Sequence, residues 1–206
     1  VIVWAVSDGD PWDGWDVHGQ RYSADGQALG GEFDVNLETT GYQNRPAVAA
    51  LADGGFVVAW QGAGTVDVYM DIQARRFHAD GTPAGNGFTV NTHLPSEQLA
   101  PVVTGLADGG YVIAWEGTYQ DGSGTGVYVQ RFAADDTPLG LETRLSVSTV
   151  GDQREAALCA LPDGGYVAAW QTAMPDGTPD QVRARCFASD GTALGAEIRV
   201  AGNLDG

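Results

Sequence analysis

Acidic and aromatic side chains crowd one short segment near the N-terminus, between residues 8 and 16. The carboxylates there are Asp8, Asp10, Asp13 and Asp16. Calcium prefers six to eight oxygen ligands, and closely spaced aspartates in a glycine-containing loop can supply them. We therefore expect this loop to be the candidate metal site, with calcium as its cofactor. The alternative is that the aspartates only form turns and carry surface charge.

Two tryptophans, Trp12 and Trp15, stand in the same segment. An exposed indole beside carboxylates suits stacking on a sugar ring, and it equally suits a contact between subunits. We expect these residues to bind ligand, with an extracellular glycan or a protein surface as the partner. The sequence contains no Ser-His-Asp order and no G-x-S-x-G motif, so it predicts no catalytic residue.

The elements that position this loop are revealed by a repeat of 55 residues. Its anchors are Asp-Gly-Gly at 53–55, 108–110 and 163–165, the tryptophans Trp60, Trp115 and Trp170, and the glutamines Gln43, Gln98 and Gln153. A period this strict indicates one supersecondary unit repeated along the chain. Trp4 occupies the tryptophan position of a first, incomplete copy.

Each copy has the pattern of an antiparallel β-meander. Asp-Gly between apolar runs is a strong hairpin signal, and we expect a type I′ turn with positive φ at both central residues. The strand at 56–60 is apolar on both faces, as a strand between neighbouring sheets must be. The strand at 197–200 alternates polar and apolar, as an outer strand should. Repeating such four-stranded units around an axis makes a β-propeller.

We therefore predict an all-β fold, a single propeller domain over 1–206 with four blades. The repeats are 1–40 (partial, lacking its first strand), 41–95, 96–150 and 151–206, which together give fifteen strands. A four-bladed ring is the first choice. An excerpt of a larger propeller and a β-solenoid are the alternatives.

The composition limits the classes of partner that the chain is expected to bind. The formal net charge is −17, and all ten basic residues are arginine. So negative a surface argues against binding to nucleic acid. No apolar run approaches the length of a membrane span, so we expect no membrane insertion. Cys159 and Cys186 fall on the first and third strands of the last copy, about 9–10 Å apart, and are expected to be buried free thiols rather than a disulfide.

Three stretches carry a family resemblance: 50–60 (ALADGGFVVAW), 71–81 (DIQARRFHADG) and 88–92 (FTVNT). They resemble the β-repeats of large secreted RTX-type, hemolysin-like calcium-binding or adhesin proteins of proteobacteria. This resemblance covers essentially the whole chain and implies export, with a bacterial extracellular or cell-surface location. It also implies a binding or structural task and supplies no catalytic motif.

The leading functional hypothesis is a secreted, non-enzymatic binding module, adhesin- or lectin-like and stabilised by calcium. A purely structural repeat, or a subunit of an extracellular assembly, is the first alternative, because the missing strand leaves an open sheet edge for self-association. A propeller-type glycosidase or polysaccharide lyase is the second, since such enzymes gather two carboxylates at one mouth of the ring.

Overall fold

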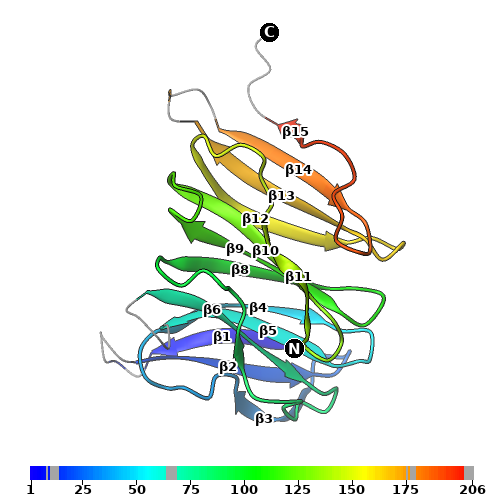
Figure 1. The fold of residues 1–206 in the computed structure, drawn as a ribbon. Helices are drawn as coiled ribbons and strands as arrows, with labels where there is room; N and C mark the ends of the chain where they lie inside the picture. The colour runs from blue at the N-terminus through cyan, green and yellow to red at the C-terminus, as the bar shows by residue number, and fades with distance from the viewer. Residues whose placement is uncertain (8, 10–13, 64–68, 175, 177–179, 202–206) are drawn as a thin grey trace.

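The computed structural model describes residues 1–7, 9, 14–63, 69–174, 176 and 180–201. The strands in this part of the chain form four antiparallel sheets, which we call blades one to four in chain order (Figure 1). Blade one holds β1 (Ile2–Ser7), β2 (Trp15–Tyr22) and β3 (Ala28–Asp34). Blade two holds β4 (Gln43–Ala50), β5 (Phe56–Ala63), β6 (Met70–Phe77) and β7 (Phe88–Thr89). Blade three holds β8 (Gln98–Gly105), β9 (Tyr111–Thr118), β10 (Thr125–Phe132) and β11 (Pro138–Arg144), and blade four holds β12 (Asp152–Ala160), β13 (Tyr166–Ala173), β14 (Gln181–Phe187) and β15 (Ile198–Ala201).

This arrangement confirms the predicted propeller of up-and-down blades, with a first blade that lacks its inner strand. Each blade follows its own chain order from the inner strand to the outer one. Blades one and four lie at opposite ends of the stack, so the four described blades form an open arc rather than the predicted four-bladed closed ring (Figure 1).

Asp-Gly turns join the first two strands of blades two, three and four, as predicted. Gly54, Gly109 and Gly164 all have φ between 83° and 88°. The preceding aspartates are not among the residues with positive φ, so the turns are not of type I′. Instead the carboxylate of Asp53 accepts a hydrogen bond from the Gly55 amide at 2.8 Å, and only the glycine takes the left-handed conformation.

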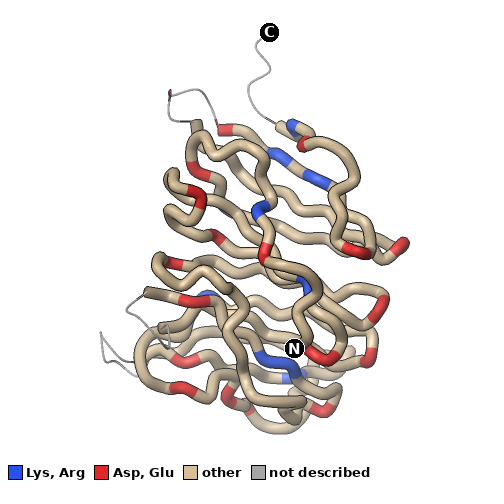
Figure 2. The backbone as a smooth tube through the Cα atoms, in the orientation of Figure 1, with Lys and Arg blue, Asp and Glu red and all other residues tan. Residues whose placement is uncertain are grey.

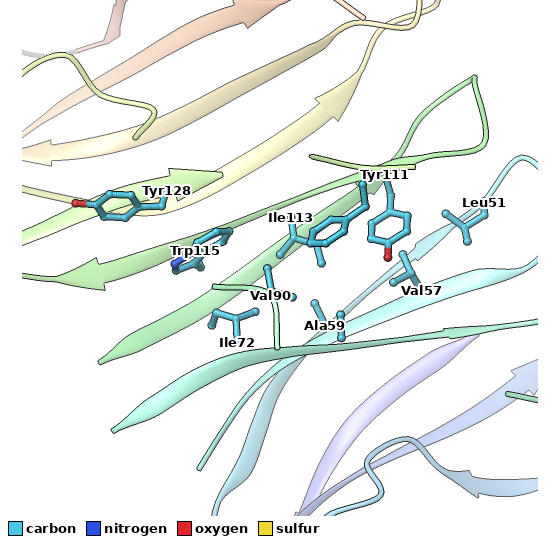
Figure 3. Packing of buried hydrophobic residues seen from close by; sticks show 11 residues of the cluster. Leu51, Val57, Ala59, Ile72, Val90, Tyr111, Ile113, Trp115 and Tyr128 are labelled. Atoms are coloured by element: carbon cyan, nitrogen blue, oxygen red, sulfur yellow. The ribbon is translucent and has the colours of Figure 1, made fainter. Parts of the chain in front are cut away.

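Neighbouring blades pack face to face through their second strands. Side chains alternate between the two faces of a strand, so both faces of β9 are buried. Trp115 and Tyr111 project onto blade two, where they meet Val57 and Ile72 (Figure 3). Val112 projects the other way, into a cluster shared with blade four. Trp60, Trp115 and Trp170 are therefore core residues, as predicted, whereas Trp4 of the incomplete blade is only half-buried.

A hydrogen bond inside the blade fixes each of two core tryptophans. Trp60 Nε1 donates to Gln43 Oε1 at 3.0 Å, and Trp115 Nε1 donates to Gln98 Oε1 at 2.9 Å. The glutamine fits because the residue two places after the tryptophan is glycine: a Cβ on Gly62 would lie 2.0 Å from Gln43 Oε1.

Blade four carries a threonine, Thr172, where the other two blades carry this glycine. There Gln153 Oε1 accepts from Ser146 instead, and Trp170 Nε1 and Thr172 Oγ1 are buried with no hydrogen-bond partner in the described part of the chain. The single change from glycine to threonine accounts for the lost bond, because the threonine Cβ occupies the place of the glutamine oxygen.

Gly62→Thr is expected to reproduce this defect in blade two. The new side chain should displace Gln43 and leave the Trp60 indole N–H unpaired, which costs roughly 1–3 kcal/mol of unfolding free energy. Urea denaturation measures the loss, and indole N–H exchange by NMR locates it at Trp60. An unchanged midpoint with a protected Trp60 N–H would contradict the role given to Gln43.

The cysteines follow the predicted topology but not the predicted burial. Both are free, on β12 and β14, with Val167 of β13 paired between them. Cys159 is exposed and Cys186 is half-buried, because no other described strand packs on this face of blade four. The expectation of two buried thiols is therefore wrong for Cys159.

In the part of the chain that Figure 2 colours, acidic residues recur along the whole stack, at turns and strand ends, and do not gather on one blade. Among the described residues, none belongs to a helix with the length and apolar character that crossing a lipid bilayer requires.

Candidate active site

Most of the loop predicted to bind calcium and ligand lies outside the described residues, namely Asp8, Asp10, Trp12 and Asp13. Two of its predicted site residues are described. Trp15 begins β2, is half-buried and forms a parallel bridge with Tyr42, so its backbone is part of the scaffold. In the part of the chain that the structure covers, no three His, Cys, Asp or Glu side chains are grouped so as to hold a metal ion.

Asp16 has a structural partner that recurs in the next blade. Its Oδ1 accepts from Asn36 Nδ2 at 2.7 Å, and Asp71 Oδ1 accepts in the same way from Asn91 Nδ2 at 2.7 Å. In both blades the asparagine Oδ1 also accepts from the backbone amide that follows the aspartate, Val17 or Ile72. This hydrogen bond therefore ties the strand that carries the aspartate, β2 or β6, to the chain that leaves the last strand of the same blade, β3 or β7.

The inner strands carry a second set of polar groups, which the sequence analysis missed. Each of β4, β8 and β12 contains a register shift, and within it one residue has a φ near 50°: Arg45, Ala100 and Glu155. An extra residue in one strand bends it and re-aims its side chains and amides. The bulge thus turns a backbone N–H of two of these strands towards the neighbouring blade.

A side chain from the preceding blade accepts this N–H, forming what we call the inter-blade clasp. Ala100 N donates to Gln61 Oε1 at 2.9 Å, and Glu155 N donates to Glu116 Oε1 at 2.8 Å. Gln61 follows Trp60 in its strand, as Glu116 follows Trp115 and Gln171 follows Trp170. The same structural task is therefore performed by a neutral amide in one blade and by a carboxylate in the next.

Glu116 is a buried carboxylate, with 9% of its surface exposed. Burial raises its pKa above the ordinary value, and the negative charge of Glu155 acts in the same direction. The hydrogen bond from the Glu155 amide and the positive charges of Arg154 and Arg45 act against this shift without cancelling it. A carboxyl group whose pKa is raised can hold a proton at a pH where most carboxyls have lost theirs.

The surroundings of Glu116 suit acid–base chemistry. Glu155, on the facing strand, donates its backbone amide to Glu116 and is itself exposed, and the charge of its carboxylate acts on Glu116. Arg154 pairs with Asp152, and Arg45 is exposed on the bulge of β4. Two carboxylates in unlike environments are the arrangement by which an enzyme keeps one as an acid and the other as a base.

A comparison of the repeats could have singled out this position. At the residue after the core tryptophan, complete copies read Gln61, Glu116 and Gln171, so one copy exchanges an amide for an acid. The bulge in the inner strand cannot be recognised from the sequence in this way, because its residues Arg45, Ala100 and Glu155 share no side-chain type.

Comparison with known proteins gives the fold a context. No family model and no curated protein matches the chain. Among solved structures, it is similar to an endo-arabinase from Bacteroides thetaiotaomicron, at 14% identity over 98% of this chain and 81% of that one, with a TM-score of 0.57. It is also similar to a Penicillium chrysogenum α-L-arabinanase complexed with arabinobiose, at 14% identity over 97% of this chain and 62% of that one, with a TM-score of 0.66. A third match is an α-L-arabinofuranosidase of Fusarium graminearum with an iminosugar inhibitor, at 12% identity over 98% of this chain and 63% of that one, with a TM-score of 0.64.

The chain has the fold of propeller glycoside hydrolases. It spans about three fifths of the length of the Penicillium and Fusarium enzymes. These matches contradict the expected resemblance to RTX-type, calcium-binding adhesin repeats, because the solved structures that share the arrangement are glycosidases. They also contradict the leading hypothesis of a non-enzymatic adhesin- or lectin-like module. Of the alternatives that the sequence leaves open, these matches favour the propeller glycosidase.

Proposed function

We propose that this chain is a glycoside hydrolase in which Glu116 is the general acid. One observation carries the proposal: at a position where Gln61 performs the structural task with an uncharged amide, Glu116 places a buried carboxyl group with a raised pKa. A carboxylate costs more to bury than an amide, so the clasp alone does not account for the acid. The fold of the glycosidase neighbours agrees with this reading.

The chemistry follows from the environments of the two carboxyl groups. Glu116 Oε1 is engaged by the Glu155 amide, so the carboxyl proton belongs on Oε2, from which it passes to the glycosidic oxygen as the bond to the anomeric carbon breaks. Glu155 supplies the second carboxylate, which faces the developing positive charge at that carbon. Water completes the reaction by adding hydroxyl to the anomeric carbon, and its second proton restores the acid.

The first substrate class to test is arabinose-containing glycan. The Penicillium neighbour is complexed with arabinobiose, and the neighbours from Bacteroides and Fusarium are an endo-arabinase and an α-L-arabinofuranosidase. A carbohydrate partner also agrees with the glycan expected from the sequence. The extracellular location and self-association through the edge of β1 stay predictions.

Glu155→Gln tests the second carboxylate. It should lower the rate of hydrolysis of linear arabinan at least about 10²-fold, because the developing charge loses its counter-charge. Reducing-sugar release gives the rate, and thermal unfolding checks the fold. Glu32→Gln, at an exposed carboxylate on β3, is the matched control and should retain the wild-type rate. Equal rates for Glu155→Gln and the control would remove Glu155 from the mechanism.

A further inference from the structure

A second glutamate position recurs in the outer part of blades three and four and ties each of these two blades to the one before it. Glu142 Oε2 accepts from the backbone N–H of Thr92 at 2.7 Å and from its hydroxyl at 2.9 Å. Glu197 Oε1 accepts from the backbone N–H of Val147. In both pairs the donor lies 50 residues before the glutamate. Each carboxylate thus binds the connection that leaves the preceding blade, and we call this contact the outer strap.

Blade two lacks the outer strap. The residue equivalent to Glu142, 55 positions earlier, is Gly87, and the amide equivalent to that of Thr92 belongs to Leu37. Leu37 is 58% exposed, and its N–H has no hydrogen-bond partner among the described residues. A backbone donor that receives a carboxylate in both later blades is therefore left without one here.

A cleft of about 350 Å³ opens at this place, lined by Leu37, Gln73, Asn86, Phe88 and the edge of Trp60, with Glu38 also on its wall. A comparison with the equivalent position in the other two complete blades explains why blade two has a cleft there. Position 73 is Tyr128 in blade three, where the ring stacks on Trp115 with centroids 6.5 Å apart. It is Arg183 in blade four, where Nη1 donates to Glu197 Oε2 at 3.1 Å.

The cleft contains hydrogen-bond donors at the positions whose equivalents in blades three and four bind a glutamate carboxylate. The Leu37 N–H corresponds to that of Thr92, and the amide of Gln73 stands where Arg183 donates to Glu197. Gln73 Nε2 now donates to Thr89 Oγ1 at 3.1 Å, a neutral partner that a stronger acceptor can replace. Phe88 and the Trp60 edge offer apolar surface, and the Asn86 side chain is exposed for hydroxyl groups.

We propose that this cleft binds a sugar bearing a carboxylate, a hexuronic acid, whose carboxylate takes the place of the missing glutamate side chain. The volume suits a mono- or disaccharide at the small end of protein ligand sites. Carboxylate on Leu37 N–H and Gln73 Nε2 gives charge-assisted hydrogen bonds, and the ring lies against Phe88. Glu38 opposes the anion, so its removal strengthens binding. The site is separate from Glu116 and stands whether or not the chain hydrolyses glycans.

The test supplies the glutamate that blade two lacks. A Cβ at Gly87 would meet Ala74 O at 3.5 Å and the Trp60 ring at 3.7 Å, ordinary contact distances, so Gly87→Glu fits without displacing the backbone. It should raise the midpoint of thermal unfolding by forming the outer strap with Leu37, and it should lower the affinity for D-galacturonate at least about 10-fold. Gly87→Ala is the matched control and should bind as the wild type does.

Binding is measured by NMR titration in a Glu116→Gln background, where turnover cannot interfere. Galacturonate should bind at least about 10-fold more tightly than galactose, which lacks only the carboxylate, and more tightly than acetate, which lacks the ring. Gln73→Tyr, copied from blade three, should also abolish binding. Equal binding of galacturonate and galactose, or unchanged galacturonate affinity in Gly87→Glu, would overturn the proposal. Either result leaves the glycosidase proposal untouched, because that proposal is tested by hydrolysis.

Discussion

Glu116→Gln is expected to lower the rate of glycan hydrolysis about 10²- to 10⁴-fold while leaving the protein folded. The side-chain oxygen of glutamine can accept the hydrogen bond from the Glu155 backbone N–H, just as Gln61 Oε1 accepts one from the Ala100 N–H. The clasp between blades three and four therefore persists. The change removes the acidic proton that the mechanism transfers, because an amide does not ionise in this pH range. Reducing-sugar release from linear arabinan measures the rate, and urea denaturation measures the free energy of unfolding.

The same variant has a pH signature in its stability. Because the folded state raises the pKa of Glu116 above its ordinary value of 4.5, it favours the protonated form. The stability of the wild type is fully present below that ordinary value and falls as pH rises through the higher, folded-state pKa. Glu116→Gln should therefore be more stable than the wild type at neutral pH, and the difference should disappear in acid.

The reciprocal control is Gln61→Glu, which places a carboxylate in the sister clasp. It should lose stability as pH rises and should leave hydrolysis at the wild-type rate. If Glu116→Gln hydrolyses arabinan as fast as the wild type, the carboxylate at this position has no catalytic part. If it unfolds at neutral pH, the clasp needs the charge and the equivalence with Gln61 is wrong.

Gly105→Ala should be the most damaging small substitution in the scaffold. A Cβ at Gly105, on β8, would lie 2.1 Å from the backbone oxygen of Ala50, at the end of β4. Both partners are inner strands, so the clash can be relieved only by separating blades two and three where they converge. Overpacking of this kind costs about 3 kcal/mol.

Gly85→Ala is the matched control, because a Cβ there meets nothing within 4 Å. Its free energy of unfolding should stay within about 0.5 kcal/mol of the wild type. Chemical denaturation of the two variants side by side gives the comparison. Equal stabilities would mean that the inner strands slide apart at little cost, and that their close approach does not hold the blades together.

The fold could be predicted from the sequence because the turn residues and the apolar pattern within each repeat indicate the same strands. Asp53-Gly54 marks a hairpin, and Trp60 marks a strand buried on both faces; both predictions are confirmed. The turn type was wrong, since a type I′ reading neglects the aspartate side chain, which bonds to the Gly55 amide. The burial of Cys159 was wrong because burial depends on a neighbouring blade, which no residue within the copy encodes.

The candidate site is harder to predict from the sequence, because it differs from its repeat equivalents in the chemistry of one side chain and not in local composition. The acidic loop around Asp8 stands out by density alone, and of its carboxylates the structure describes only Asp16, which bonds to Asn36. Glu116 stands out only when it is aligned with Gln61 and Gln171. Its burial and the bulge that brings Glu155 to it arise from the meeting of two blades, 39 residues apart in sequence.

The release of sugars from linear arabinan by the wild-type chain, in water labelled with oxygen-18, tests the glycosidase proposal most directly. Mass spectrometry of the products should find arabino-oligosaccharides or arabinose carrying the label at the new reducing end, and Glu116→Gln should remove them. A folded wild-type chain that releases no labelled product from arabinan, or one whose products persist undiminished in Glu116→Gln, would contradict the proposal.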